Sequence, residues 1–234
     1  MNTKMKVLAL AVVGMFGFAG SAFAVCPAGP DTAHGGAWTA VNALGGTAVI
    51  ATPGYAGTEC RLDSALTGDA SSFATVEDDS PSGESRYRAQ FIINADALTL
   101  GAIDAAYIFS AQSGSGAQVQ LSIVGDGAGG KLVSYFVPDT AASGGSDIGS
   151  FPLTAGENHV EFDLDNSGHF SIWVNNNVEA SPNFTTTTLN NGGATIETAF
   201  LGLAGATPSF VSANNGVAAG FDQFDSRRQT FIGF

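Results

Sequence analysis

The stretch NHVEFDLDNSGHFSIWVN, residues 158–175, shows the clearest alternation of apolar and polar positions in the chain. Positions 160, 162 and 164 are apolar and lie between acidic residues, and positions 170, 172 and 174 are apolar again. A period of two residues is typical of a β-strand with one buried and one open face. Asn166-Ser167-Gly168 has the composition of a tight turn. The pattern therefore predicts a β-hairpin.

Similar short runs recur between clusters rich in glycine, serine and asparagine, and no helix of ordinary length is evident after position 24. The runs predict strands at 47–52, 72–76, 86–94, 105–111, 118–124, 131–137, 196–203 and 218–224. The motifs FIIN (91–94) and AYIF (106–109) are apolar at successive positions, which predicts central strands covered on both faces. Segments 144–150 and 209–216 are expected to be exposed loops. About twelve short strands at this spacing indicate a β-sandwich or a barrel.

The first 24 residues have the pattern of a secretory signal peptide. Lys4 and Lys6 precede an apolar run that ends at the small-x-small motif Ala22-Phe23-Ala24. We expect cleavage after Ala24, which leaves a single β-sandwich domain over residues 25–234. The mature protein is then secreted, periplasmic or attached to the cell surface.

The chain contains two cysteines, Cys26 and Cys60. An even number of cysteines in an exported protein predicts a disulfide. A closed loop of about 35 residues stabilises the fold by roughly 3 to 4 kcal/mol in the chain-entropy description. The disulfide is expected to tie the start of the mature chain to the body of the domain.

The charge of the chain is strongly negative. The sequence holds 21 acidic and 8 basic residues, and two of the basic ones, Lys4 and Lys6, lie in the predicted signal peptide. Six basic residues against 21 acidic ones leave a formal charge of −15 after cleavage. Such a surface repels nucleic acid phosphates and anionic lipid headgroups, so we expect neither nucleic acid nor a membrane as partner.

Two motifs give the chain a resemblance to a known family. The segment GENHVEFDLDNSGHFSIWVNN is similar to the W-H-x-V…LWVDG hairpin of laminin-G-like and related concanavalin-A-like jelly-roll domains. The segment AAGFDQFDSRR, with Gly220, Asp222 and Phe224, stands where that family has its closing G-x-x-D-x-V strand. The chain departs from the family at Asn158, where a tryptophan is usual, and at 175–177, where an Asp-Gly turn is usual. The resemblance implies an all-β fold of two antiparallel sheets, the jelly roll.

The same resemblance suggests a cation site at Asp222. In several carbohydrate-binding sandwiches with this ending, an aspartate in the last strand helps to hold a structural Ca²⁺. Carboxylate oxygens are hard ligands suited to Ca²⁺. The alternative is that Asp222 bonds nearby backbone or pairs with Arg227 or Arg228.

Trp173 is the candidate ligand-binding residue. It lies on the polar side of its strand, opposite to Phe170, Ile172 and Val174. An exposed tryptophan on a sheet face commonly marks a binding surface, here a platform for a sugar ring. The alternative is that a second sheet or a loop covers it.

No catalytic motif was found. Glycoside hydrolysis requires two carboxyl groups a few ångströms apart, and the acidic glucanase motif E-x-D-x-x-E is missing from the sequence. Glu77, Asp78, Asp79 and Glu84 form the densest acidic group, but serine and proline interrupt it, and we interpret it as a solvated loop.

The ending FDQFDSRRQTFIGF predicts a closing strand. Phe221 and Phe224 are three residues apart, so both can be buried only if the strand contains a bulge or is covered on two sides. Phe231, Ile232 and Phe234 are further candidates for packing. The terminal phenylalanine is also common in small outer-membrane β-barrels.

Taken together, these features predict an exported, non-catalytic binding or structural module. Its expected partners are polysaccharides or cell-surface glycans, in glycan binding or adhesion, and self-assembly is a further alternative. The alternatives are a polysaccharide hydrolase or lyase and a small outer-membrane barrel.

Overall fold

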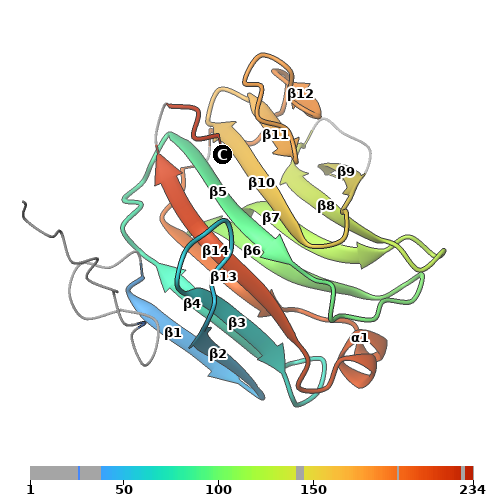
Figure 1. Cartoon of the computed structure of the whole chain (residues 1–234). Coiled ribbons are helices and arrows are strands. Elements are labelled where there is room, and N and C mark those ends of the chain that lie inside the picture. The colour runs from blue at the N-terminus through green and yellow to red at the C-terminus, as the bar shows by residue number, and fades with distance from the viewer. Residues whose placement is uncertain (1–25, 27–37, 141–144, 194, 228–229, 234) are drawn as a thin grey trace, which may run out of the picture.

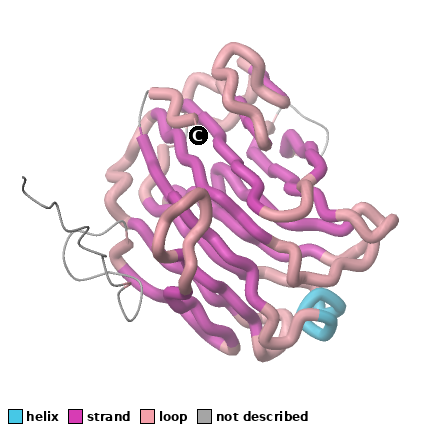
Figure 2. The backbone as a smooth tube through the Cα atoms, viewed as in Figure 1, coloured by secondary structure: helices cyan, strands magenta, loops and turns pink. Residues whose placement is uncertain are grey.

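The computed structural model describes residues 26, 38–140, 145–193, 195–227 and 230–233. Their strands form two antiparallel sheets of seven strands each, packed face to face (Figure 1 and Figure 2). This architecture confirms the predicted two-sheet β-sandwich. The predicted signal peptide lies outside the described residues.

The back sheet, named from its place in Figure 1, has the strand order β1-β4-β13-β6-β7-β8-β9. In this order its strands are Ala40–Leu44, Phe73–Asp78, Thr198–Ala204, Ala105–Ser113, Gly116–Gly125, Lys131–Pro138 and Ser146–Pro152.

The front sheet has the strand order β12-β11-β10-β5-β14-β3-β2. Its strands are Phe184–Thr186, Phe170–Val174, Glu157–Asp165, Arg86–Asn94, Ala218–Arg227, Arg61–Leu66 and Gly46–Ala51. One short helix, α1 (Pro208–Ala213), precedes β14.

The predicted hairpin is confirmed as β10 and β11, which pair with Val160 opposite Val174 and Leu164 opposite Phe170. Its turn requires glycine at Gly168, which has a φ of +98°. A Cβ atom there would lie 2.3 Å from the carbonyl oxygen of Leu189, closer than any side chain tolerates. The turn thus combines a backbone conformation that favours glycine with a close approach of another segment.

The core lies between the sheets and is formed by the apolar residues of alternate positions. Phe91 of the front sheet stacks on Phe109 of the back sheet with ring centroids 5.8 Å apart. Phe109 also contacts Phe162 at 5.1 Å. Aromatic pairs at these distances add to the stability that burial of their area provides.

The closing strand contains a bulge, which is one of the two arrangements that the spacing of its phenylalanines predicts. The pairing of β14 with β5 shifts between Asp222 and Asp225, and Gln223 has a φ of +48°. The bulge lets both phenylalanines contact core rings, because the centroid of Phe221 lies 6.3 Å from that of Phe91 and the centroid of Phe224 lies 6.3 Å from that of Phe109.

Two loop predictions are wrong. Segment 144–150 contains most of β9, which pairs with β8 along seven residues. Segment 209–216 contains most of α1, whose Phe210 and Val211 are buried. The helix begins after Thr207, whose hydroxyl accepts a hydrogen bond from the Phe210 N–H, an N-cap arrangement. Strands β1, β3 and β12 were not predicted.

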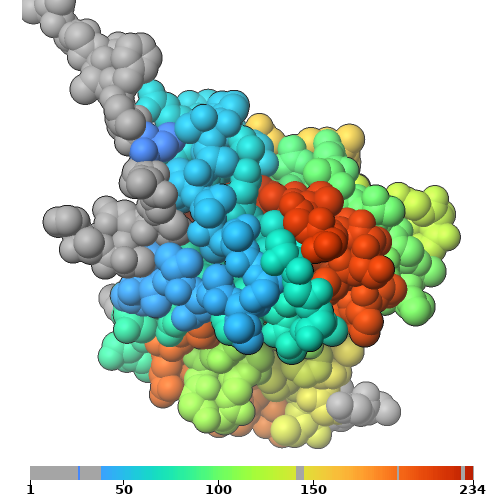
Figure 3. All heavy atoms as spheres, turned by 90° about the horizontal axis from the view of Figure 1, so that it is seen from below, coloured from blue at the N-terminus to red at the C-terminus, as the bar shows by residue number. Residues whose placement is uncertain are grey.

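Segments far apart in sequence meet at the lower end of the sandwich. In Figure 3 the red segment that includes α1 lies beside the cyan segment that leads into β4. Gly216 N–H donates to the Leu66 carbonyl at 2.7 Å across this junction. The predicted disulfide between Cys26 and Cys60 is confirmed, with a Cα–Cα distance of 5.6 Å, and it attaches residue 26 to the start of β3. None of the helices in the described part of the chain is both long and apolar enough to cross a bilayer.

Candidate functional site

The outward faces of the two sheets differ in what covers them. On the back sheet, the pairing registers align one outward row of side chains across neighbouring strands. This row consists of Glu77, Phe200, Ser110, Gln120, Phe136 and Ile148. Adjacent strands are about 4.8 Å apart, so Phe200 and Phe136, three strands apart, are separated by roughly 14 Å along the row.

A pocket of about 540 Å³ lies over this outward face, where β4, β13, β6 and β7 meet. We call it the back-sheet pocket. Its aromatic lining consists of Phe73, Tyr107, Phe200 and the buried Phe109. Its polar lining includes Asn42, Ser71, Ser72, Thr75, Ser110, Gln112 and Gln120. A sheet face with open aromatic rings between amides and hydroxyls is suited to binding a ligand with both apolar and polar surfaces.

A β-bulge on β6 turns Tyr107 into this pocket. Tyr107 lies opposite Ser122, and Phe109 lies opposite Leu121, so the register shifts by one residue between them. Phe109 therefore faces the core while Tyr107 faces outward and remains 38% exposed. The prediction that the AYIF strand is covered on both faces is wrong at this position.

The turn after β13 leaves room for the Tyr107 ring because it contains glycine. A Cβ atom at Gly205 would lie 2.2 Å from two ring carbons of Tyr107. Gly205 also has a φ of +53°, which favours glycine. Both observations indicate that the position of this ring depends on Gly205.

The back-sheet pocket is electrically neutral, since no charged side chain is among its described lining residues. Gln112 Nε2 donates to the Ser110 hydroxyl at 3.1 Å. Asn42 Nδ2 donates to Glu77 at 2.5 Å, so that carboxylate is engaged beside the pocket. Without a pair of carboxyl groups in its described lining, the pocket lacks the acid and base that glycoside hydrolysis requires.

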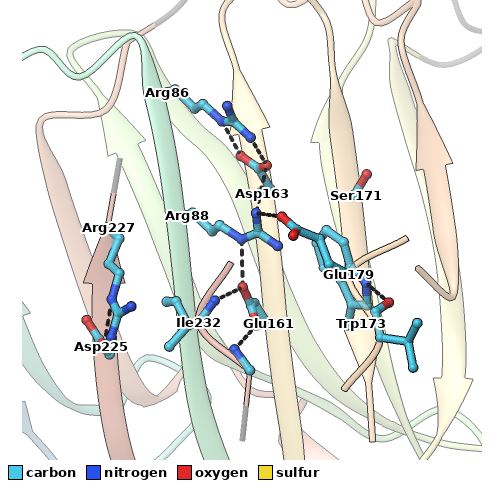
Figure 4. A network of polar contacts seen from close by, with 12 residues as sticks. Arg86, Arg88, Glu161, Asp163, Ser171, Trp173, Glu179, Asp225, Arg227 and Ile232 are labelled. Atoms are coloured by element: carbon cyan, nitrogen blue, oxygen red, sulfur yellow. Dashed lines mark hydrogen bonds and ion pairs between the residues drawn. The ribbon is translucent and has the colours of Figure 1, made fainter. Parts of the chain in front are cut away.

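The outward face of the front sheet carries a buried charge cluster instead (Figure 4). Arg88 of β5 is 1% exposed and its Nε lies 2.6 Å from Glu161 Oε1 on β10. Its Nη1 lies 3.2 Å from Glu179 and 3.6 Å from Asp163. Arg86 also binds Asp163 with two N–H groups, and this hydrogen bonding raises the pKa of Arg86. Burial removes the hydration of these charged groups, so each of them must be stabilised by a partner of opposite charge.

Trp173 lies beside this cluster and is not an open platform. It faces outward as predicted, but only 4% of its surface is exposed. Its Nε1–H donates to the Val178 carbonyl at 3.1 Å. The Phe231 ring lies 5.5 Å from it, and the Arg88 guanidinium lies 4.7 Å from each of the two rings. The expected exposure of Trp173 is therefore wrong, because a loop and a distant segment cover it.

The covering segment is Phe231, Ile232 and Gly233, which lies near the end of the chain over β5 and β10 (Figure 1). The N–H groups of Ile232 and Gly233 donate to the two carboxylate oxygens of Glu161, each at 3.0 Å. The buried carboxylate thus accepts bonds from Arg88 on one side and from backbone on the other. Charge-assisted bonds of this kind are stronger than those between neutral groups.

Asp222, the candidate Ca²⁺ ligand, holds the loop between β2 and β3 against β14. Its Oδ2 accepts from the Tyr55 N–H at 2.6 Å and from the Thr58 hydroxyl, and its Oδ1 accepts from the Gln223 N–H at 2.7 Å. No group of three or more His, Cys, Asp or Glu side chains suited to a metal occurs among the residues described. The geometry matches the alternative that Asp222 bonds nearby backbone, and the calcium hypothesis remains a prediction.

The three sequence candidates do not share one surface. Trp173 and Asp222 both lie on the outward face of the front sheet, on β11 and β14, which are three strands apart. Glu77 lies on the back sheet. The interpretation of 77–79 as a solvated loop is wrong in part, because β4 extends to Asp78, which is buried and accepts a hydrogen bond from the Ser80 N–H.

The residues that dominate both faces were not predicted from the sequence. The pairing of Arg88 with Glu161 had a signal, because arginines alternate at 86 and 88 and acids at 161 and 163 on strands that prove to be neighbours. Opposite charges on adjacent strands stabilise a sheet. The aromatic lining of the back-sheet pocket had no such signal, since it depends on a bulge and on strands that are distant in sequence.

Comparisons with known proteins support the fold and no more. Neither a known protein family nor a curated protein matches the sequence. The structure is similar to the binding domain of botulinum neurotoxin serotype G, with a TM-score of 0.51 and 12% identity over 82% of this chain and 44% of that one. It is similar to a botulinum neurotoxin type C structure with a TM-score of 0.52 and 9% identity, again over 82% of this chain and 44% of that one. Cell entry of that toxin depends on interaction with two ganglioside molecules. This chain spans less than half the length of either structure, and the likeness shows a shared β-sandwich architecture.

Proposed function

We propose that this protein is an exported, non-catalytic binding module that takes a neutral glycan in the back-sheet pocket. The observation that carries the proposal is the combination of three aromatic side chains, Phe73, Tyr107 and Phe200, with neutral amides and hydroxyls on one open sheet face. The volume of about 540 Å³ lies within the range of roughly 300 to 1,000 Å³ that is usual for ligand pockets.

The chemistry of the lining favours a sugar over other ligands. A sugar ring has one face rich in C–H groups, which packs on an aromatic ring, and a rim of hydroxyls, which bond to amides. Gln120 makes no side-chain hydrogen bond to any described residue, so its amide is available to a ligand. The negative charge of the chain disfavours polyanionic glycans, which leaves neutral ones.

The shape of the outward row favours an extended ligand. The row continues from the pocket through Gln120 to Phe136 and Ile148, which are exposed on β8 and β9. A chain of sugar units laid across the strands would contact Phe200 and Phe136 at positions roughly 14 Å apart, given the usual strand spacing. Polysaccharide is thus a better fit than a single sugar.

An extracellular location is consistent with the disulfide, which persists in oxidising compartments. We place the protein outside the cytoplasm, as a secreted, periplasmic or cell-surface module with a role in glycan binding or adhesion. The observed sandwich supports the resemblance to laminin-G-like jelly-roll domains at the level of the fold. The ganglioside binding of a structural neighbour gives a precedent for glycan recognition on a related architecture.

Pull-down with a panel of insoluble and soluble neutral polysaccharides tests the proposal. Tyr107→Ala and Phe200→Ala should each lower affinity for the bound polysaccharide by about tenfold, equivalent to about 1.4 kcal/mol. Trp173→Phe on the front sheet is the control and should bind as wild type. Retention of full affinity by both back-sheet variants, or release of reducing sugar from the panel, would refute the proposal in this form.

A further inference from the structure

The front sheet holds a second site, which the glycan proposal does not use. We call Arg88, Glu161 and Trp173 the Arg88 site. In this structure the segment Phe231–Gly233 lies against these side chains, because Phe231 contacts Trp173 and the N–H groups of Ile232 (Figure 4) and Gly233 donate to Glu161.

The contacts of this segment are those of a bound peptide. The Phe231 ring and the Trp173 ring each lie 4.7 Å from the Arg88 guanidinium, and their centroids are 5.5 Å apart, so the two rings and the guanidinium form one cluster. Two successive backbone N–H groups donate to the two oxygens of Glu161 at 3.0 Å. Glu161 is 5% exposed, so its carboxylate lost most of its hydration and depends on these donors.

The site also constrains the second of the two donor residues, Gly233. Gly233 has a φ of +66°, and a Cβ atom there would lie 2.5 Å from Asn177 Oδ1 and 3.1 Å from the Phe231 ring. The site therefore recognises an aromatic side chain followed by two residues that donate backbone N–H groups, the second of which is a glycine.

The site retains one unused donor. Arg88 Nη2 is buried and makes no hydrogen bond to any described residue. A buried guanidinium N–H without a partner costs free energy, so an acceptor such as a peptide carbonyl would be stabilised there. The contacts with Phe231–Gly233 leave this donor unused.

We propose that the Arg88 site is a peptide-docking site whose partner is the Phe231–Gly233 segment of a second copy of this chain. The chain's own segment matches the site, and every copy carries both the segment and the site. The segment follows β14, which ends at Arg227, so the local copy competes at high effective concentration and dominates in dilute solution. Exchange between copies makes a self-assembling module, since swapping an identical element is a low-cost route to association.

Two full-length variants test the exchange between copies. One, the acceptor, can only receive a segment, and the other, the donor, can only provide one. The acceptor, Phe231→Ala with Ile232→Pro, keeps its site but loses the ring and one N–H of its own segment. The donor, Trp173→Ala, keeps its segment but lacks one wall of its site. Each alone should sediment as a monomer, and an equimolar mixture should sediment as a heterodimer. A donor that also carries Phe231→Ala is the matched control and should leave the mixture monomeric.

A synthetic peptide Thr-Phe-Ile-Gly tests the site without relying on the donor's fold. It should bind the acceptor variant at least about tenfold more tightly than it binds wild type, whose site is occupied. Methylation of the isoleucine nitrogen, which removes one donor to Glu161, should weaken binding by about tenfold. Circular dichroism confirms that the acceptor is folded.

The outcomes are distinct. Failure of the peptide to bind a folded acceptor would overturn the docking site itself. Peptide binding without a heterodimer, with both variants folded, would overturn the exchange between copies. Glycan binding on the opposite sheet is expected to be unchanged in both variants, so these results are independent of the proposed function.

Discussion

The two outward faces of the sandwich are built from the same kind of strand and have opposite characters. The back sheet presents Tyr107 to solvent in a neutral pocket, whereas the front sheet buries Trp173 against an arginine under a segment from the end of the chain. Both aromatics occupy outward positions on their strands. Outward orientation therefore follows from local alternation, while exposure depends on what the rest of the chain places above the strand.

The largest expected effect is the loss in the free energy of unfolding when a buried ion pair of the front sheet is broken. Glu161→Ala should lower the free energy of unfolding by about 3 to 5 kcal/mol, because it leaves the Arg88 guanidinium buried without its shortest partner. Urea denaturation measures this value. Asp225→Ala is the matched control, since Asp225 pairs with Arg227 at 2.6 Å at an exposed position, and it should cost no more than about 1 kcal/mol. Equal losses in the two variants would contradict the contrast between a buried and an exposed pair.

Removal of the Phe231 ring should expose Trp173 to solvent. Phe231→Ala should cost about 1 to 2 kcal/mol through loss of its contact with the Arg88 guanidinium, and it should expose Trp173. Tryptophan fluorescence of the folded variant should shift to longer wavelength. Phe136→Ala on the back sheet removes an exposed ring and should leave both stability and emission nearly unchanged. An unshifted spectrum in folded Phe231→Ala would show that this ring does not shield Trp173.

Asp222 tests whether the front sheet also binds a cation. The calcium hypothesis predicts that Ca²⁺ raises the melting temperature of the wild type and has no effect on Asp222→Ala. Without Ca²⁺, the same substitution should cost about 1 to 3 kcal/mol, because it removes the acceptor that holds the Tyr55 N–H. A wild-type melting temperature that is indifferent to Ca²⁺ would leave Asp222 as a loop anchor alone.

The smallest effect is expected from pH. Burial lowers the pKa of His159, on the outward face of the front sheet, from its ordinary 6.5, and nearby Glu157 opposes this only in part. The neutral imidazole is therefore favoured in the fold, so its stability contribution is complete above pH 6.5 and is lost as pH falls through the lower folded pKa. His159→Asn should flatten the stability profile between pH 5.5 and 7.5 by less than about 1.4 kcal/mol. An identical slope in wild type and variant would contradict this assignment.

The fold was predictable from the sequence where local rules decide it. Alternation at 160–174 predicted the hairpin, and the spacing of Phe221 and Phe224 predicted either a bulge or burial on two sides, of which the bulge is observed. Helix α1 was missed because its six residues are too few for a periodic pattern. Strand β9 was missed because its exposed edge lacks clear alternation.

The candidate site was less predictable because its residues become neighbours only through the topology. Phe73, Tyr107 and Phe200 come from β4, β6 and β13, and no short-range pattern links them. The orientation of Trp173 was right and its exposure was wrong, since Phe231 lies 58 positions further along the chain. Sequence alternation specifies the face of a strand, and only long-range packing specifies whether that face is available.

A titration of the protein with the polysaccharide that it retains, followed by NMR, locates the ligand on one face or the other. We expect the ring resonances of Tyr107 and the side-chain amide resonances of Gln120 to shift until the site is saturated, while the indole Nε1–H resonance of Trp173 stays unchanged. Shifts confined to the Trp173 indole and the Arg88 guanidinium, with the back-sheet pocket unchanged, would contradict this expectation.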